Sequence, residues 1–380
     1  ASALGSAPAK AGLILTVLIL GATVANINTS ISNVALPSIA SALNATDTEL
    51  TGITDAYQLG IAATVLYLGA VGDRYGRKGM LLLGALLCVP FSLASAWSPN
   101  AVFLIVAQIA VGVAGGMLYP TTLSMITALW RGKKLTGAIA LWTGLGTGAS
   151  VLGPIMGGYL LDNYWWGSVF LITVPFALLV LVMGAIILPR SRAAEKAPVD
   201  HAGGSLSVVM ISSFVLGIVM LPQGITITVA ILFAVTLVSG TLFVWRQKRA
   251  PNPLFDLELA AVPTFWVAFV AGLVAFGALV GAMFIGQQFT QNVLRYTPLH
   301  AVLLTLALAL GMLPASVFAG KLIGKRGTRF TFIIGLAFIA IGFVEMLITW
   351  RAGTAEVWVV LAYLLVGIGI GMAATPASRS

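Results

Sequence analysis

Two carboxylates, Asp55 and Glu345, lie within long apolar stretches of this 380-residue chain. An ionisable group inside an apolar helix is costly, so it is a functional candidate by default. A carboxyl group that is buried in apolar surroundings can exchange protons near neutral pH. The first chemistry to consider is therefore proton transfer. The alternative is that both side chains reach water, since each lies close to a predicted helix end.

Neutral polar side chains in the apolar stretches are candidates for binding a small-molecule substrate. They are Asn28, Asn33, Gln108, Trp142, Gln287 and Gln288. Asn28 and Asn33 belong to a polar face of the first stretch, where neighbouring Ser and Thr are explained equally well by hydrogen bonds between helices. Trp142 can stack on an aromatic or cationic ligand, or it can simply fill space. For Gln287 and Gln288 a cavity lining and a helix end both fit.

Other chemistries find no support in the sequence. No nucleophile–base pair, metal-ligand cluster or phosphate-binding loop occurs, so we expect no enzyme, no metal and no cofactor. Cys88 is the only cysteine, which excludes a disulfide framework.

The composition predicts an all-α integral membrane protein. Hydrophobic residues make up 59% of the chain and charged residues 8%, with a mean hydropathy of +1.04. A membrane-spanning helix needs about 20 mainly apolar residues. Twelve segments meet this requirement, at 12–35, 50–70, 79–97, 101–126, 135–161, 168–188, 205–221, 224–245, 264–291, 299–320, 330–350 and 355–376.

The net charge of +9 reflects membrane orientation, and we expect no nucleic-acid partner. If the N-terminus is cytoplasmic, all but two of the 20 Lys and Arg residues fall on the cytoplasmic side; the exceptions are Arg295 and Arg351. Tryptophans near the predicted helix ends, Trp350 among them, are interpreted as interfacial anchors. We expect no cleavable signal peptide, because the first apolar segment is full length.

A short charged turn joins the second and third segments and reads Gly69-Ala-Val-Gly-Asp-Arg-Tyr-Gly-Arg-Lys78. Its spacing resembles the signature loop between helices 2 and 3 of the major facilitator superfamily. Five residues carry the motif: Gly69, Asp73, Arg74, Gly76 and Arg77. We expect Asp73 at the start of the next helix, where the helix dipole favours a carboxylate. The resemblance implies that Asp73 and Arg77 gate the cytoplasmic face.

A glycine–proline motif in the fifth segment suggests the direction of transport. Gly153, Pro154, Gly157 and Gly158 resemble the signature of the superfamily's exporters. Small residues also permit close helix packing, so packing alone is the competing interpretation. The resemblance implies export of amphipathic small molecules or drugs across the plasma (inner) membrane, with protons as the coupling ion.

An internal repeat defines the expected domains. Residues 320–329 match 69–78 at an offset of 251, with Gly327 in place of Gly76 and Gly324 in place of Asp73. Residues 366–372 match 111–117 at an offset of 255. We therefore expect a six-helix bundle over 1–188, linkers and an inserted helix pair over 189–263, and a second bundle over 264–380. The resemblance is to the fourteen-helix drug:proton antiporters, which implies two further helices beyond Ser380 and a monomer.

Two departures from that family leave alternatives open. Asn28 stands where the family has an acidic residue, and Gln108 where it has Arg. Because Asn cannot titrate, Asn28 cannot carry the proton. Asp55 matches a family acidic position and is favoured as the proton carrier, whereas Glu345 has no such match. The alternatives are an uncoupled or differently coupled carrier, and a membrane sensor that does not transport.

Overall fold

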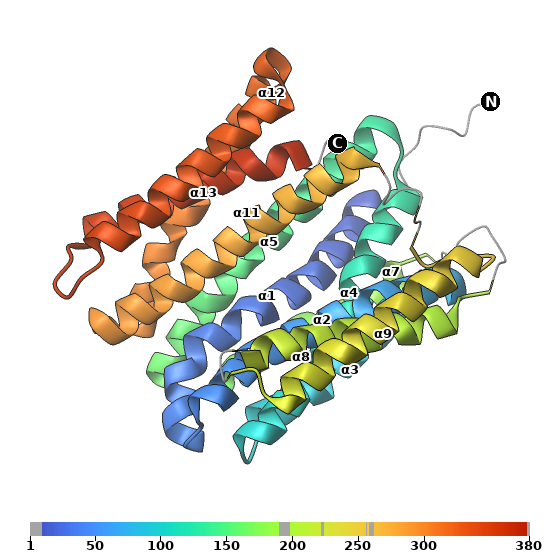
Figure 1. The fold of residues 1–380 in the computed structure, drawn as a ribbon, viewed down its shortest axis with the longest axis horizontal. Coiled ribbons are helices and arrows are strands. Elements are labelled where there is room, and N and C mark those ends of the chain that lie inside the picture. The colour runs from blue at the N-terminus through green and yellow to red at the C-terminus, as the bar shows by residue number, and fades with distance from the viewer. Residues whose placement is uncertain (1–9, 190–197, 222–223, 256, 258–261, 378–380) are drawn as a thin grey trace. The chain divides into compact units, whose positions relative to one another are not determined.

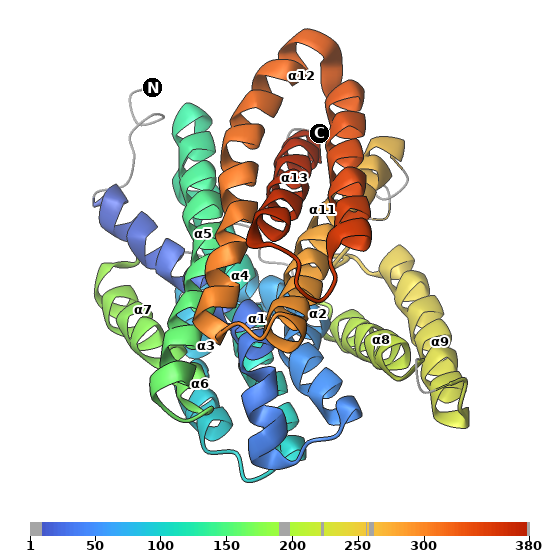
Figure 2. The ribbon, with the colours of Figure 1, turned by 90° about the vertical axis from the view of Figure 1, so that its left-hand side faces the viewer.

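The computed structural model describes residues 10–189, 198–221, 224–255, 257 and 262–377, and no strand is found among them. The chain divides into two compact units, Ala1–Phe255 (unit 1) and Asp256–Ser380 (unit 2). Each unit is built from helices that pack on one another (Figures 1 and 2). The fold is that of an all-α membrane protein, as the composition predicted.

The described residues of unit 1 form nine α-helices in chain order. They are α1 (Ala11–Leu43), α2 (Asp47–Tyr75), α3 (Arg77–Ala96), α4 (Ala101–Leu129), α5 (Gly132–Asn163), α6 (Ser168–Leu171), α7 (Thr173–Ile187), α8 (His201–Met220) and α9 (Ile227–Arg249). α2 begins with a capping box, in which Thr46 Oγ1 accepts from the Glu49 amide and Glu49 Oε2 accepts from the Thr46 amide. The bonds from Thr46 hold the pKa of Glu49 below its ordinary value.

The described residues of unit 2 form three long helices and one π-helical turn. They are α11 (Pro263–Gln288), the turn η2 (Phe289–Val293), α12 (Pro298–Thr349) and α13 (Glu356–Ala377). α12 consists of two limbs that meet at Gly327, whose φ of 83° and ψ of 169° are not helical. Figure 2 shows the two limbs of α12 running in opposite directions, with α13 between them in this view, and α13 contacts both limbs.

The observed helices follow the predicted segments closely. Nine helices in the described part of the chain are long and apolar enough to cross a membrane, and α12, counted once, contains two predicted segments. α2 and α5 coincide with predicted segments but do not meet that measure. The total of twelve spans stays a prediction. The seventh predicted segment, 205–221, corresponds to α8, which starts earlier than predicted, at His201.

The internal repeat is confirmed by equivalent helix contacts in the two units. In unit 1, a Cβ at Gly60 of α2 would collide with the carbonyl oxygen of Ile109 in α4. In unit 2, a Cβ at Gly311 of α12 would collide with the carbonyl oxygen of Leu364 in α13. These residues correspond at the predicted offsets of 251 and 255.

Two further pairs of contacts follow the same offsets. Gly112 lies against the Tyr57 carbonyl, as Gly367 lies against that of Leu308. Gly84 in α3 lies against the Ala114 carbonyl. Its counterpart Gly335 lies against the carbonyl of Gly369. Both units therefore use the same backbone-to-backbone crossings.

These crossings predict a sharp difference between two Gly→Ala substitutions. At Gly112, an added methyl group would meet the Tyr57 carbonyl and, at 2.9 Å, the Gly60 Cα. Gly112→Ala should cost about 1–3 kcal/mol, as overpacking of a close contact does. It should lower the melting temperature of the purified protein. The matched control is Gly137→Ala in α5, where nothing lies within 4 Å of the added methyl group. Equal melting temperatures for Gly112→Ala and Gly137→Ala would contradict the close backbone contact between α2 and α4 at Gly112.

Candidate functional site

The charged turn is tighter than the sequence suggested. α2 continues to Tyr75 and α3 starts at Arg77, so only Gly76 connects them. Gly76 has a φ of 137°, a conformation that side-chain-bearing residues rarely adopt. The expected position of Asp73 at the start of the next helix was wrong: Asp73 lies in the last turn of α2, together with Arg74. The helix dipole therefore does not explain this carboxylate.

Asp73 joins three helices through its carboxylate. Its Oδ1 accepts from Arg77 Nε, at 2.6 Å, in the first turn of α3. The same oxygen accepts from Ser124 Oγ of α4. The Arg77 side chain is 13% exposed and that of Asp73 is 43% exposed. The carboxylate thus links α2 to α3 and α4 while one side of it still faces outward. The sequence motif identified Asp73 and Arg77 but gave no signal for Ser124.

Neighbouring residues complete this end of the unit. Lys78 Nζ donates to the carbonyl oxygens of Ala185 and Leu188 at the end of α7, at 2.7 and 2.8 Å. A cation is favoured there, because the last carbonyls of a helix lack internal partners. Gly69 and Gly72 leave room for Pro120 and Thr121 of α4.

A histidine that the sequence analysis missed attaches α8 to α2. His201 Nδ1 is hydrogen-bonded to the Tyr67 hydroxyl at 2.8 Å, and Nε2 to that of Tyr75 at 3.3 Å. Tyr75 also stacks on the imidazole, with 6.3 Å between ring centroids. Gly204 lies directly against the Tyr67 ring, so a larger residue there would push the helices apart. The inserted helices are thereby held next to the charged turn.

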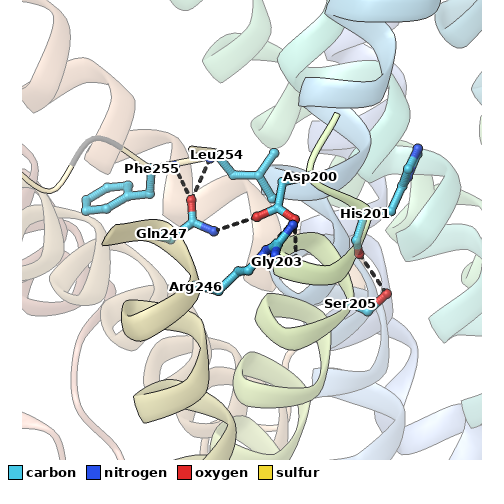
Figure 3. A network of polar contacts seen from close by, with 8 residues as sticks. All are labelled: Asp200, His201, Gly203, Ser205, Arg246, Gln247, Leu254 and Phe255. Atoms are coloured by element: carbon cyan, nitrogen blue, oxygen red, sulfur yellow. Dashed lines mark hydrogen bonds and ion pairs between the residues drawn. The ribbon is translucent and has the colours of Figure 1, made fainter. Parts of the chain in front are cut away.

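The start of α8 is fixed by Asp200, its N-cap (Figure 3). Asp200 Oδ1 accepts from the Gly203 amide at 3.0 Å and from Arg246 Nε at 3.1 Å, and Oδ2 accepts from Gln247 Nε2 at 3.3 Å. Gln247 Oε1 in turn accepts from the amides of Leu254 and Phe255. This buried carboxylate is well satisfied, which indicates a structural role. An Asp just before an apolar run is a helix-start signal that could have located it.

The two neutral amides that replace charged family residues have separate partners. Asn28 is 2% exposed; its Nδ2 donates to the Val24 carbonyl and its Oδ1 accepts from Thr173 Oγ1 at 3.1 Å. Gln108 is 1% exposed, and its Nε2 donates to Ser95 Oγ at 2.9 Å, while its buried Oε1 has no hydrogen-bond partner among the residues that the structure describes. Asn33, the other predicted asparagine, lies outside the residues whose side chains the structure describes.

Trp142 and the glycine–proline motif both take part in packing. The Trp142 ring contacts Tyr119, with 5.1 Å between centroids, and its Nε1 donates to Thr122 Oγ1 at 3.1 Å. Since both its ring and its N–H are engaged, the geometry favours the packing interpretation. Gly153, Pro154, Gly157 and Gly158 are buried within α5. Gly157 leaves room for Ile31 of α1.

The two membrane carboxylates differ in their surroundings. Asp55 lies in α2 and is partly buried, and no hydrogen bond or ion pair to its carboxylate is found within the described ranges. Glu345 lies in the second limb of α12, where its Oε1 accepts from Thr349 Oγ1 at 2.7 Å. Gln287 is buried and Gln288 partly buried at the end of α11. Gln288 Oε1 accepts from Asn292 Nδ2.

Comparison with known proteins identifies the family. The family model described as Major Facilitator Superfamily matches residues 18–379. The multidrug efflux pump LfrA of Mycolicibacterium smegmatis is 34% identical, over 97% of this chain and 73% of its own length. The methyl viologen resistance protein SmvA of Salmonella typhimurium is 30% identical, over 97% of this chain and 77% of SmvA. The multidrug resistance protein Stp of Mycobacterium tuberculosis is 29% identical, and the chain spans 65% of its length.

Solved structures share the fold. A peptide transporter in complex with sulfate has a TM-score of 0.64 and 15% identity, over 96% of this chain and 86% of the transporter. A POT family transporter in complex with 5-aminolevulinic acid has a TM-score of 0.65 and 16% identity, over 96% of this chain and 82% of that protein. The family match, the duplicated helix crossings and the charged turn agree: this chain belongs to the major facilitator superfamily and is a membrane transporter, not an enzyme.

Proposed function

We propose that the protein exports amphipathic small molecules from the cytoplasm across the plasma membrane, in exchange for protons. The observation that carries the proposal is its similarity, over 97% of the chain, to the multidrug efflux pump LfrA. Two repeated bundles permit alternating access to a binding site. The glycine–proline motif of α5, which packs on α1, further supports export.

The charges support the proposed orientation and gating. On the predicted topology, all but two of the Lys and Arg residues fall on the same side as the N-terminus, which favours a cytoplasmic N-terminus. Asp73 and Arg77 are proposed to hold the cytoplasmic end of unit 1 in a fixed shape during the transport cycle. The ion pair and the Ser124 bond give this role a physical basis.

Asp55 is the proposed proton carrier of unit 1. Asn28 has no titrating group, and its amide is engaged with Thr173. Asp55 is partly buried and no partner for it is found in the described part of the chain, so a proton can occupy its carboxylate without breaking an existing ion pair. A carrier that does not use protons is the competing function, favoured by the neutral residues Asn28 and Gln108.

Proton coupling predicts a response to an imposed pH gradient. In proteoliposomes, flux of a fluorescent drug should rise when the gradient is applied, and Asp55→Asn should abolish that rise. The matched control is Asp47→Asn, an exposed residue in the first turn of the same helix. If the unsubstituted protein transports at the same rate with and without the gradient, the carrier is not proton-coupled. Binding of the drug without any flux would favour a sensor.

Gating predicts a separate effect at the charged turn. Asp73→Asn keeps the shape of the side chain but removes the charge that Arg77 and Ser124 bind. Efflux should slow by about three- to tenfold, a moderate loss because the pair is partly exposed. The amount of protein in the membrane should stay unchanged. Asp162→Asn, at an exposed position in α5, serves as the control. Normal efflux from Asp73→Asn would remove the gating role.

A further inference from the structure

Two neighbouring residues at the start of α8, Asp200 and His201, bind two different parts of unit 1. Asp200 is the N-cap of α8 and His201 is its first residue. Figure 3 shows the His201 imidazole pointing away from the Asp200 carboxylate. A single peptide unit therefore carries two side chains that make contacts in different directions.

The His201 side of this peptide unit binds α2. Its Nδ1 is hydrogen-bonded to the Tyr67 hydroxyl and its Nε2 to the Tyr75 hydroxyl. The Tyr67 ring also meets the imidazole edge to face, with 5.9 Å between centroids. Tyr75 belongs to the charged turn and directly precedes Gly76, the one residue between α2 and α3. A movement of the first turn of α8 therefore either moves the charged turn or breaks these bonds.

The Asp200 side binds the end of α9. Besides capping α8 at the Gly203 amide, its carboxylate accepts from Arg246 Nε and from Gln247 Nε2. Asp200 and Gln247 are both buried, so water does not compete for the bond between them. The position of the Gln247 side chain thus depends on Asp200.

Gln247 in turn holds the start of the connector, by which we mean residues 250–255 after α9. Its Oε1 accepts from the Leu254 amide at 2.6 Å and from the Phe255 amide at 3.2 Å. These amides lie outside any helix, and unit 1 ends at Phe255. One side chain therefore fixes the backbone at the point where the chain leaves unit 1 (Figure 3).

Apolar packing alone does not account for this arrangement. α8 and α9 are long and apolar enough to cross a membrane, and most of their apolar surface is exposed, as expected of helices that face lipid. A helix pair that only occupied lipid would need no buried carboxylate with three donors and no histidine between two tyrosines. Both sets of polar contacts occur at the start of α8, next to the charged turn.

We infer that Tyr67, Tyr75, Asp200, His201 and Gln247 form a joint that couples the charged turn to the start of the connector. We call this group the α8 joint. Its members are positioning residues, because they act through the charged turn and contact no substrate. The inference rests on the proposed gating role of that turn and gives the inserted helix pair a part in it: movement at the turn is passed to the connector, and the reverse.

Hydrogen–deuterium exchange of the purified full chain, without drug or pH gradient, tests both sides of the joint. His201→Ala removes the bonds to α2 and should speed exchange of the Leu254 and Phe255 amides by about two- to tenfold, the effect of weakening one hydrogen bond. Coupling between two sites is reciprocal. Gln247→Met should therefore speed exchange of the Gly76 amide, which is hydrogen-bonded to a carbonyl of α2.

The matched control is Ser205→Ala, which removes only a hydrogen bond to the His201 carbonyl within α8. It should leave exchange unchanged at both places. His201 is exposed, so His201→Ala should fold, and it decides the question if Gln247→Met at its buried position does not. The joint is overturned if His201→Ala leaves the Leu254 and Phe255 amides exchanging at the rate of the unsubstituted protein.

Efflux from proteoliposomes tests the consequence for gating. His201→Ala should lower the maximal rate by about two- to tenfold and leave the KM for the drug unchanged, because no member of the joint is a candidate drug-binding residue. In an Asp73→Asn background it should cause little further loss, since both substitutions act on one turn. Normal efflux from His201→Ala, or full additivity with Asp73→Asn, would overturn the inference. The export proposal is judged separately, by flux through the unsubstituted protein.

Discussion

Close contact between helix backbones is the constraint on which the rest of this structure depends. Lipid is as apolar as a leucine side chain, so the hydrophobic effect does not drive membrane helices together. Van der Waals attraction between two helices requires their backbones to lie close together, and glycines permit this because they have no side chain. Gly60 and Gly112 mutually place α2 on α4, and Gly311 and Gly367 do the same for α12 and α13. The positions of the candidate side chains on α2, α4 and α12 depend on these crossings.

The charged residues of the turn lie at helix ends, outside the close backbone crossings. Asp73 contacts Arg77 and Ser124, and Lys78 binds the last carbonyls of α7. His201 then attaches α8 to Tyr67 and Tyr75 of α2. In a neutral imidazole one nitrogen donates and the other accepts, and a tyrosine hydroxyl can do either. Both ring nitrogens of His201 thus join the inserted helices to the region of the charged turn.

The sequence predicted the helices and their repeat well, because both depend on local patterns. Apolar length located α1 to α13, and the match of Gly327 to Gly76 located the bend within α12. Contacts between residues far apart in the sequence were harder to predict. Neither Ser124 nor His201 has a local pattern that reveals its partner in another helix. Asp73 was placed in the wrong helix because a one-residue turn permits α2 to run further than a charged sequence suggests.

The bend at Gly327 can be compared with the turn at Gly76, because the two glycines occupy equivalent positions in the internal repeat. Both copies of the turn retain a glycine with positive φ, yet the second copy has Gly324 where the first has Asp73. Two helices therefore join at this angle without the carboxylate. The glycine is therefore enough to make the corner, and the carboxylate adds contacts with Arg77 and Ser124 that the second corner, with Gly324 at this position, does not have.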